Sequence, residues 1–213
     1  LIYFVDELPK KGDDIRSSNS SIRPGGTAIN CSELISLWNK SVEVRGNSIG
    51  KDPMGKYLVN YLKEKNINFD SLIINELMTP TCSIFIDSSG ERTIVSSGYE
   101  SLECSKDEIS VNEANNLIDS ETVEYILLTS SSLPARLISL EGAIEIVPPD
   151  FKTINSNGAG DATAAYIAAF GVADLIPNIK KACAAGAIVA GTNDRPTIEK
   201  IEEISQLVEV NPR

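Results

Sequence analysis

The sequence predicts an α/β protein built as a three-layer α/β/α domain around a mostly parallel sheet. Two observations support this prediction. Strand-like and helix-like hydrophobic patterns alternate along the chain, and glycine-containing turns follow several of the strand-like segments. The chain has 213 residues, which is enough for one such domain with a small appendage. We therefore expect residues 1–213 to form a single domain.

Short strand-like segments lie within residues 1–23 and 81–97. Turn signals interrupt them at residues 11–14 and 87–90. These two regions are expected to form a small β lid. A lid of this kind excludes water from a reacting group when it closes.

The first glycine turn lies in residues 23–30 and leads into a helical pattern of apolar residues. Residues 42–44 then follow as a predicted strand. The next segment contains three glycines that we expect to form structural turns: Gly46, Gly50 and Gly55. An amphipathic helix is predicted from about residue 56 to residue 65.

Residues 155–161 carry the most informative motif, Asn-Ser-Asn-Gly-Ala-Gly-Asp. A strand-like segment precedes it and a helix-like one follows. The first N–H groups of a helix have no partner within the helix, so this arrangement favours anion binding. Gly158 and Gly160 lack the Cβ atoms that would keep a phosphate away. Asp161, in the first turn, can accept a proton from a hydroxyl group while the amides hold a phosphoryl group.

Two further helices are predicted towards the end of the sequence. Residues 180–190 are rich in small apolar side chains and predict a buried helix that packs closely on its neighbour. Residues 196–204 predict an amphipathic helix that begins near Pro196 or Thr197.

The composition excludes several classes of function. The formal net charge is −11, which argues against nucleic acid or an anionic membrane surface as a partner. The longest apolar run is too short to span a bilayer. The four cysteines are far apart and contain no Cys-x-x-Cys pair, so we expect them to be reduced in a cytoplasmic protein. The sequence has no histidine, which rules out Ser-His-Asp and Cys-His catalysis within it.

Taken together, the glycine motifs resemble the two signatures of the PfkB (ribokinase-like) family of carbohydrate and nucleoside kinases. Gly25, Gly26 and Asn30 match the N-terminal signature, and residues 155–161 match the C-terminal one. Residues 81–94 resemble the family's hairpin, which ends in Gly-Glu-Arg-Thr. The resemblance covers nearly the whole chain and implies a ribokinase-like fold.

The resemblance also implies roles for individual residues. Asp161 would be the general base of phosphoryl transfer from ATP with Mg²⁺. The anion hole would consist of the backbone amides of Gly158, Ala159 and Gly160. The sugar pocket would contain Gly25, Gly26, Thr27 and Asn30, and the nucleotide side would contain Asn112 and Thr129. No metal ligand is assigned.

Two motifs differ from the family pattern. The Asn-x-x-Glu motif has Asn115 in place of its Glu, and the Thr-x-Gly-x-x-Gly loop, which begins at Thr129, has lost both glycines. These changes favour one alternative function, that of a catalytically weak regulator that binds a sugar or nucleotide. Retention of Asp161 argues against this alternative.

At three places the sequence is shorter than the family pattern. The Asp that binds sugar hydroxyls would fall before Leu1, and the joins near residues 104–106 and near residue 120 leave little room for βα units. Because a parallel crossover needs a dozen or more residues, we expect segments to be missing at these three places.

The leading hypothesis is therefore an ATP-dependent kinase acting on a hydroxyl of a sugar or related small polyol. A nucleoside kinase is an alternative, since Tyr3, Phe4 and Phe85 could stack on a base. Family lids often pair in a dimer, and a homodimer here would use the apolar lid residues Ile2, Phe4, Ile84, Ile86 and Ile94. A Rossmann dehydrogenase is disfavoured because no Gly-x-Gly-x-x-Gly follows an N-terminal strand.

Overall fold

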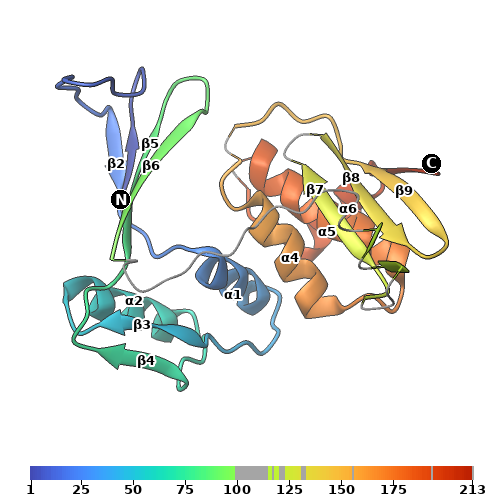
Figure 1. The fold of residues 1–213 in the computed structure, drawn as a ribbon, viewed down its shortest axis with the longest axis horizontal. Coiled ribbons are helices and arrows are strands. Elements are labelled where there is room, and N and C mark those ends of the chain that lie inside the picture. Colours follow the sequence, from blue (N-terminus) through green and yellow to red (C-terminus); the bar gives the residue numbers. More distant parts are fainter. Residues whose placement is uncertain are drawn as a thin grey trace. The chain divides into compact units, whose positions relative to one another are not determined.

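A computed structural model describes residues 1–98, 115–116, 118–119, 123–130, 133–154, 156–192 and 194–212, without the side chains of residues 46–48 and 130. The chain divides into two compact units, Leu1–Leu102 and Glu103–Arg213. Figure 1 colours the first from blue to green and the second from yellow to red. Both units combine helices with sheets, which confirms the predicted α/β class.

The first unit contains a four-stranded sheet, which we call the N-terminal sheet. Its strands are β1 (Ile2–Phe4), β2 (Asn19–Ser21), β5 (Thr81–Ile86) and β6 (Arg92–Ser97), in the order β2-β1-β5-β6. β1 and β5 are parallel, whereas β1 and β2, and likewise β5 and β6, are antiparallel. All four strands lie within the two regions in which the sequence predicts strands.

The remainder of the first unit is a βαβ arrangement with one additional helix. Its elements are α1 (Thr27–Leu37), β3 (Gly46–Gly50), α2 (Pro53–Glu64) and β4 (Leu72–Asn75). β3 and β4 pair in parallel, with α2 as the crossover between them. Four buried side chains form the core of this part: Ile29, Val44, Leu62 and Ile67. Burial of such a side chain contributes roughly 1.5–3 kcal/mol.

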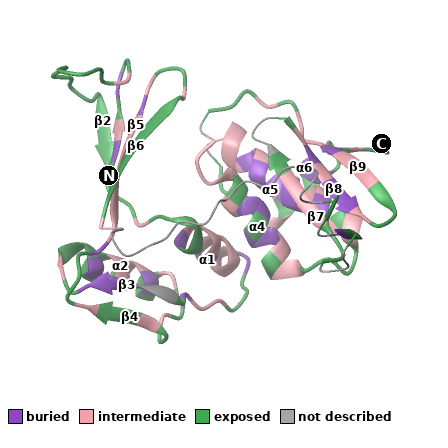
Figure 2. Ribbon diagram, in the orientation of Figure 1, coloured by how far each residue is buried: buried purple, intermediate pink, exposed green. Residues whose placement is uncertain are grey.

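The second unit packs helices with an antiparallel sheet. The strands are β7 (Ile126–Ser130), β8 (Leu133–Ser139), β9 (Gly142–Val147) and β10 (Glu209–Pro212), in the order β10-β9-β8-β7. The helices are α4 (Ala159–Phe170), α5 (Leu175–Gly191) and α6 (Ile198–Ser205). α5 packs against both α4 and α6, and Figure 2 shows buried residues along it. The predicted buried helix and the final amphipathic helix are thus confirmed.

The structure corrects the prediction for residues 42–55. Residues 42–44 do not form a strand, and only Glu43 makes an isolated bridge, to Asn68. The strand is instead Gly46–Gly50, a segment predicted to be a turn, and Gly55 lies inside α2. β3 forms because β4 supplies a parallel partner, which outweighs the low intrinsic strand preference of its glycines and Asn47.

The pairing of the strands also differs from the prediction. Among the strands that the structure describes, only β1·β5 and β3·β4 are parallel; the N-terminal sheet is mixed and the sheet of the second unit is antiparallel. Short connections join β5 to β6 and β8 to β9, and a short connection allows only antiparallel pairing of the strands that it joins.

The apolar residues of the N-terminal sheet are less uniformly exposed than the sequence predicts. Ile2 and Ile86 are buried, whereas Phe4 is 40% exposed and Ile94 is 46% exposed. β6 is exposed along its whole length because it lies at the edge of the sheet. In the part of the chain that the structure describes, no helix has the length and apolar character needed to cross a membrane.

Candidate functional site

The C-terminal glycine motif forms the start of α4. Gly158 has φ 86° and ψ 0°, a left-handed conformation that glycine adopts without strain, and it is the N-cap residue of the helix. A Cβ atom added to Gly160 would meet nothing within 4 Å, so this side of the turn is open. Asp161 is half-buried in the first helical turn. The predicted order of strand, glycine turn and helix is confirmed.

Backbone hydrogen bonds hold the first residues of α4. Gly158 offers no side-chain cap to α4, and the Ala159 amide donates a long hydrogen bond of 3.3 Å to the Ser156 carbonyl oxygen. The first intrahelical bond runs from the Ala162 amide to the Gly158 carbonyl oxygen, at 2.9 Å. N–H groups at a helix start have no helical partner, so this turn is suited to an anion.

The N-terminal glycine motif forms the start of α1. Gly26 is the N-cap residue, with φ 88° and ψ 149°, and its carbonyl oxygen accepts a 3.0 Å hydrogen bond from the Asn30 amide. A Cβ atom on Gly25 or Gly26 would meet nothing within 4 Å. Thr27 is exposed and Asn30 is half-buried. Since Gly26 and Asn30 are one turn apart, the predicted sugar residues gather at one end of α1.

The structure therefore brings the predicted residues together as two sets, one in each unit. Gly25, Gly26, Thr27 and Asn30 belong to the first unit, and Gly158, Ala159, Gly160 and Asp161 belong to the second. Thr129 is exposed near the end of β7, whereas the sequence predicts that a nucleotide loop begins there. Asn112 and the abrupt joins near residues 104–106 and 120 lie outside the described residues.

A third group of residues, which the sequence did not reveal, surrounds Asp52. Asp52 is the N-cap residue of α2, which begins three residues before the predicted start: its carboxylate accepts from the Gly55 amide at 2.8 Å. The same carboxylate accepts from the Thr79 amide at 2.7 Å and from the Thr79 hydroxyl at 2.9 Å. These bonds, led by the one from the Thr79 amide, lower the pKa of Asp52.

Two glycines make this arrangement possible. A Cβ atom on Gly50 would lie 2.1 Å from the Leu77 carbonyl oxygen, and one on Gly55 would lie 1.9 Å from the Gly50 carbonyl oxygen. The Gly50 amide also donates to the Thr79 hydroxyl at 2.9 Å. Both glycines are therefore required by close backbone approach, a reason that is visible only in three dimensions.

Comparison with known proteins identifies the family. The family model of the pfkB family carbohydrate kinases matches residues 1–128. The chain belongs to this family. It is 26% identical over 93 residues to a ribokinase from Dictyostelium discoideum, an alignment that covers 43% of this chain and 29% of that protein. The match thus spans less than a third of the length of this curated relative.

Solved structures of PfkB-type kinases share the fold. A ribokinase from Thermotoga maritima has a TM-score of 0.76 at 14% identity, with 96% of this chain and 95% of that chain covered. A nucleoside kinase from Methanocaldococcus jannaschii gives 0.71 at 18%, covering 96% and 94%. Phosphofructokinase-2 from Escherichia coli gives 0.75 at 14%, covering 96% and 94%. These similarities confirm the ribokinase-like fold.

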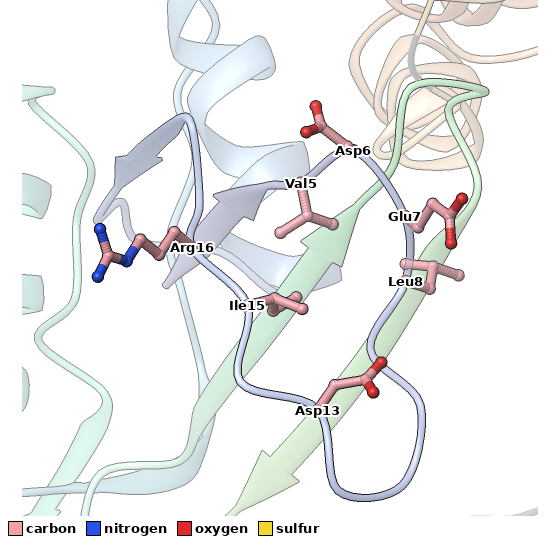
Figure 3. Close-up of a pocket in the computed structure, with 7 residues that line it drawn as sticks. All are labelled: Val5, Asp6, Glu7, Leu8, Asp13, Ile15 and Arg16. Carbon is pink, nitrogen blue, oxygen red and sulfur yellow. The ribbon is translucent and has the colours of Figure 1, made fainter.

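One cavity of this PfkB family chain lies in its first unit, beside β1. It measures about 440 Å³ and is lined by Val5, Asp6, Glu7, Leu8, Asp13, Ile15 and Arg16 (Figure 3). The guanidinium of Arg16 points away from the three carboxylates in this view, so the charged part of the wall is acidic. None of the predicted sugar or phosphoryl residues lines this cavity.

Phosphoryl transfer from a nucleotide generally involves a divalent metal ion. Within the described ranges, no group of three or more His, Cys, Asp or Glu side chains could hold a metal ion by itself. Magnesium in kinase sites usually keeps several waters and takes one or two carboxylates together with substrate phosphates. Asp161 is the one carboxylate among the predicted site residues and would serve as the base, so substrate phosphates and waters would supply most ligands of such an ion.

Proposed function

We propose that this chain carries an ATP-dependent kinase activity that phosphorylates a hydroxyl group of a sugar or related small polyol. One observation carries the proposal beyond family membership: left-handed Gly158 opens α4, and Asp161 lies in its first turn. This arrangement places a carboxylate beside helix N–H groups that can hold a phosphoryl group.

The chain's own residues supply binding, charge stabilisation and a base. The Asp161 carboxylate accepts the proton of the acceptor hydroxyl. The hydroxyl oxygen then bonds to the γ-phosphorus, and the bond from that phosphorus to the bridging oxygen of the leaving ADP breaks. Amides of Gly158, Ala159 and Gly160 hold the equatorial oxygens, so that positioning and charge stabilisation provide most of the catalysis.

The remaining residues bind the two substrates. The sugar is held at the start of α1 by Gly25, Gly26, Thr27 and Asn30, whose amide group offers a donor and an acceptor to neighbouring hydroxyls. Thr129 and Asn112 contribute to the nucleotide side, where ATP binds with Mg²⁺. We infer that both units belong to one kinase domain and that the N-terminal sheet acts as its lid, which keeps water from the phosphoryl group. The reaction would take place in the cytoplasm.

A direct assay tests this function. ATP consumption by the full-length protein is measured against a panel of sugars and nucleosides, with Asp161→Asn in parallel. We expect turnover with one acceptor and a loss of about 10²- to 10⁴-fold in kcat in the variant, because a positioned base contributes that much. Ligand binding by thermal shift without turnover would instead support the regulator alternative.

A nucleoside acceptor is the second candidate, and one contact favours it. Tyr3 in β1 and Phe85 in β5 are stacked, with ring centroids 5.3 Å apart and an interplanar angle of 17°. The two residues pair across the parallel strands, so their side chains share one face of the N-terminal sheet. A flat aromatic surface of this kind suits a nucleobase. The acceptor panel separates the two candidates, since only one class would be phosphorylated.

We also propose that the N-terminal sheet pairs with that of a second copy in a homodimer. Phe4 and Ile94 are exposed apolar residues on this sheet, and β6 is an exposed edge strand. Exposed apolar surface and an open sheet edge both favour association.

A further inference from the structure

The last two turns of α5 pack closely against the segment that carries the second glycine motif. The approach to α4 itself is closest at Gly186, which is buried. A Cβ atom at Gly186 would lie 2.5 Å from the Thr163 hydroxyl oxygen and 2.9 Å from the Ala159 carbonyl oxygen. Both distances are shorter than ordinary van der Waals contact, so α4 and α5 could not lie this close with any larger residue at this position.

Neighbouring positions of α5 contact the same segment. The Ala190 carbonyl oxygen accepts a 2.8 Å hydrogen bond from the Ile154 amide. A Cβ atom on Gly191 would lie 2.5 Å from the Phe151 Cβ, and one on Gly158 would lie 3.8 Å from the Val189 side chain. The end of α5 therefore supports the connection before the turn as well as the turn itself.

The carbonyl oxygen of Ala159 is the atom through which Gly186 acts. This oxygen also accepts a 3.2 Å hydrogen bond from the Thr163 hydroxyl, one helical turn later. Thr163 is buried, so its hydroxyl has little freedom to move aside. Ala159 is the first residue of α4, and its peptide unit is continuous with the amides of the turn. A shift of its carbonyl would therefore shift the amides and Asp161 together.

A glycine at this position is also unfavourable for the helix itself. Glycine in a helix interior is less stable than alanine because it loses more backbone freedom on folding. α5 otherwise has alanine at Ala182, Ala184 and Ala185, which are all buried. The contact with α4 explains why residue 186 is glycine and not another alanine.

We propose that Gly186 is a positioning residue for phosphoryl transfer. Because it has no side chain, α5 can lie close to the first turn of α4, and this contact fixes the position of that turn. The proposal rests on the function proposed above, because the turn matters only if it holds a phosphoryl group. Gly186 touches no substrate. It acts by fixing where the turn amides and the Asp161 carboxylate point.

The test compares Gly186→Ala with a matched control in the full-length enzyme. Gly191→Ala adds the same methyl group to the same helix, but against the Cβ of Phe151, which lies in the connection and not in α4. We expect Gly186→Ala to lower kcat by about 10- to 100-fold with the KM for the acceptor within about twofold, because a displacement of about 1 Å at a reacting group has that effect. Gly191→Ala should lower kcat less than Gly186→Ala does, because it displaces the connection before the turn and not the first residue of α4.

A rescue variant separates positioning from a general loss of stability. Thr163→Ala removes the hydroxyl at the shorter of the two contacts, so the double variant with Gly186→Ala should recover part of kcat. The double variant also keeps the test usable if Gly186→Ala alone does not fold. Unchanged kcat in Gly186→Ala, or equal losses in Gly186→Ala and Gly191→Ala, would overturn the proposal.

Hydrogen exchange distinguishes failure of this proposal from failure of the proposed function. Exchange of the amides of residues 158–163 should be faster in Gly186→Ala than in Gly191→Ala, whether or not the enzyme turns over. If the unchanged protein is inactive on every acceptor, the proposed function fails, while the exchange result still reports whether Gly186 positions the turn. Equal exchange at these amides in the two variants would refute the positioning itself.

Discussion

At the scale of single residues, Asp52 connects two parts of the first unit. Its carboxylate caps α2 through the Gly55 amide and holds the amide and hydroxyl of Thr79. Thr79 is 7% exposed and precedes β5 by two residues, so the carboxylate fixes the point at which the chain enters the N-terminal sheet. Gly98, which follows β6, approaches the same point: a Cβ on it would lie 3.0 Å from the Pro80 Cα. Both ends of the β5–β6 hairpin are thus anchored near one carboxylate.

Replacement of Asp52 by alanine should therefore cost more than the loss of an ordinary helix cap. We expect Asp52→Ala to lower the free energy of unfolding by about 2 kcal/mol or more, because it removes a cap and leaves the buried Thr79 amide without an acceptor. Urea unfolding measures this. Asp70→Ala is the control, since Asp70 is exposed in a nearby turn and should change stability by less than about 0.5 kcal/mol.

The effect of Asp52 should also depend on pH. Its pKa in the folded protein lies below the ordinary value of 3.8, so its stabilisation is present above pH 3.8 and is lost as the pH falls through the lower folded value. The difference in unfolding free energy between the unchanged protein and Asp52→Ala should be constant near neutral pH and should shrink below pH 3.8. A difference that grows on acidification would contradict this account.

At this scale, the sequence predicts residues whose role depends on near neighbours and fails for those with distant partners. The sequence predicts the helix only from about residue 56, although Asp52 followed by Pro53 is a typical helix start. Thr79 has no such signal, since its partner is 27 residues away in the chain. Gly186 is similar: the sequence indicates a small-residue helix, but only the packing shows which position cannot carry a Cβ atom.

At the scale of elements, helices are predicted better than strands. α2, α4 and α6 are each marked by an apolar pattern together with a capping residue or a glycine at the start, whereas α5 is marked only by its small apolar residues. β3 is missed because its sequence, Gly-Asn-Ser-Ile-Gly, has little strand preference and depends on pairing with β4. Whether two strands pair in parallel or antiparallel likewise depends on partner strands that the local sequence does not contain.

The packing of α5 can be checked through Cys183. This thiol is buried, and burial raises its pKa to about 11 from an ordinary 9.0. The thiolate fraction at pH 8 is therefore about 100-fold lower than for an ordinary thiol, and access of a reagent is restricted as well. We expect alkylation of Cys183 in the native protein to be at least about 100-fold slower than in urea, as measured by mass spectrometry of the labelled peptide. Equal rates in the two conditions would show that α5 is not buried as described.

At the scale of the whole molecule, the family and the α/β class follow from the sequence, whereas the assembly does not. The two glycine signatures identify the family because each one combines a turn with a helix start in a fixed order. The contacts of the N-terminal sheet depend on which apolar residues are left uncovered, and the alternating pattern cannot reveal this. Ile2 and Ile86 were expected on an exposed face and are buried, while Phe4 and Ile94 are exposed on it.

The proposed homodimer leads to a prediction that depends on the face of the sheet. Ile94 pairs with Ile84, which pairs with Ile2, so these side chains lie on the same face as Phe4; Val95 pairs with Ser83 on the opposite face. Val95 is 60% exposed and is a matched control for Ile94. We expect Ile94→Lys to weaken self-association by about 100-fold or more, because a two-fold interface would bury the unpaired charge twice. Val95→Lys should leave self-association nearly unchanged.

Sedimentation equilibrium of the full-length protein and the two variants gives the answer directly. If both variants dissociate equally, the edge of β6 rather than one face carries the contact, because both residues lie in that strand and differ only in the face that they occupy. If the unchanged protein is a monomer, the exposed face serves lid closure alone. Its apolar side chains would then become covered when a substrate binds, and the variants would differ in the KM for the acceptor instead of in mass.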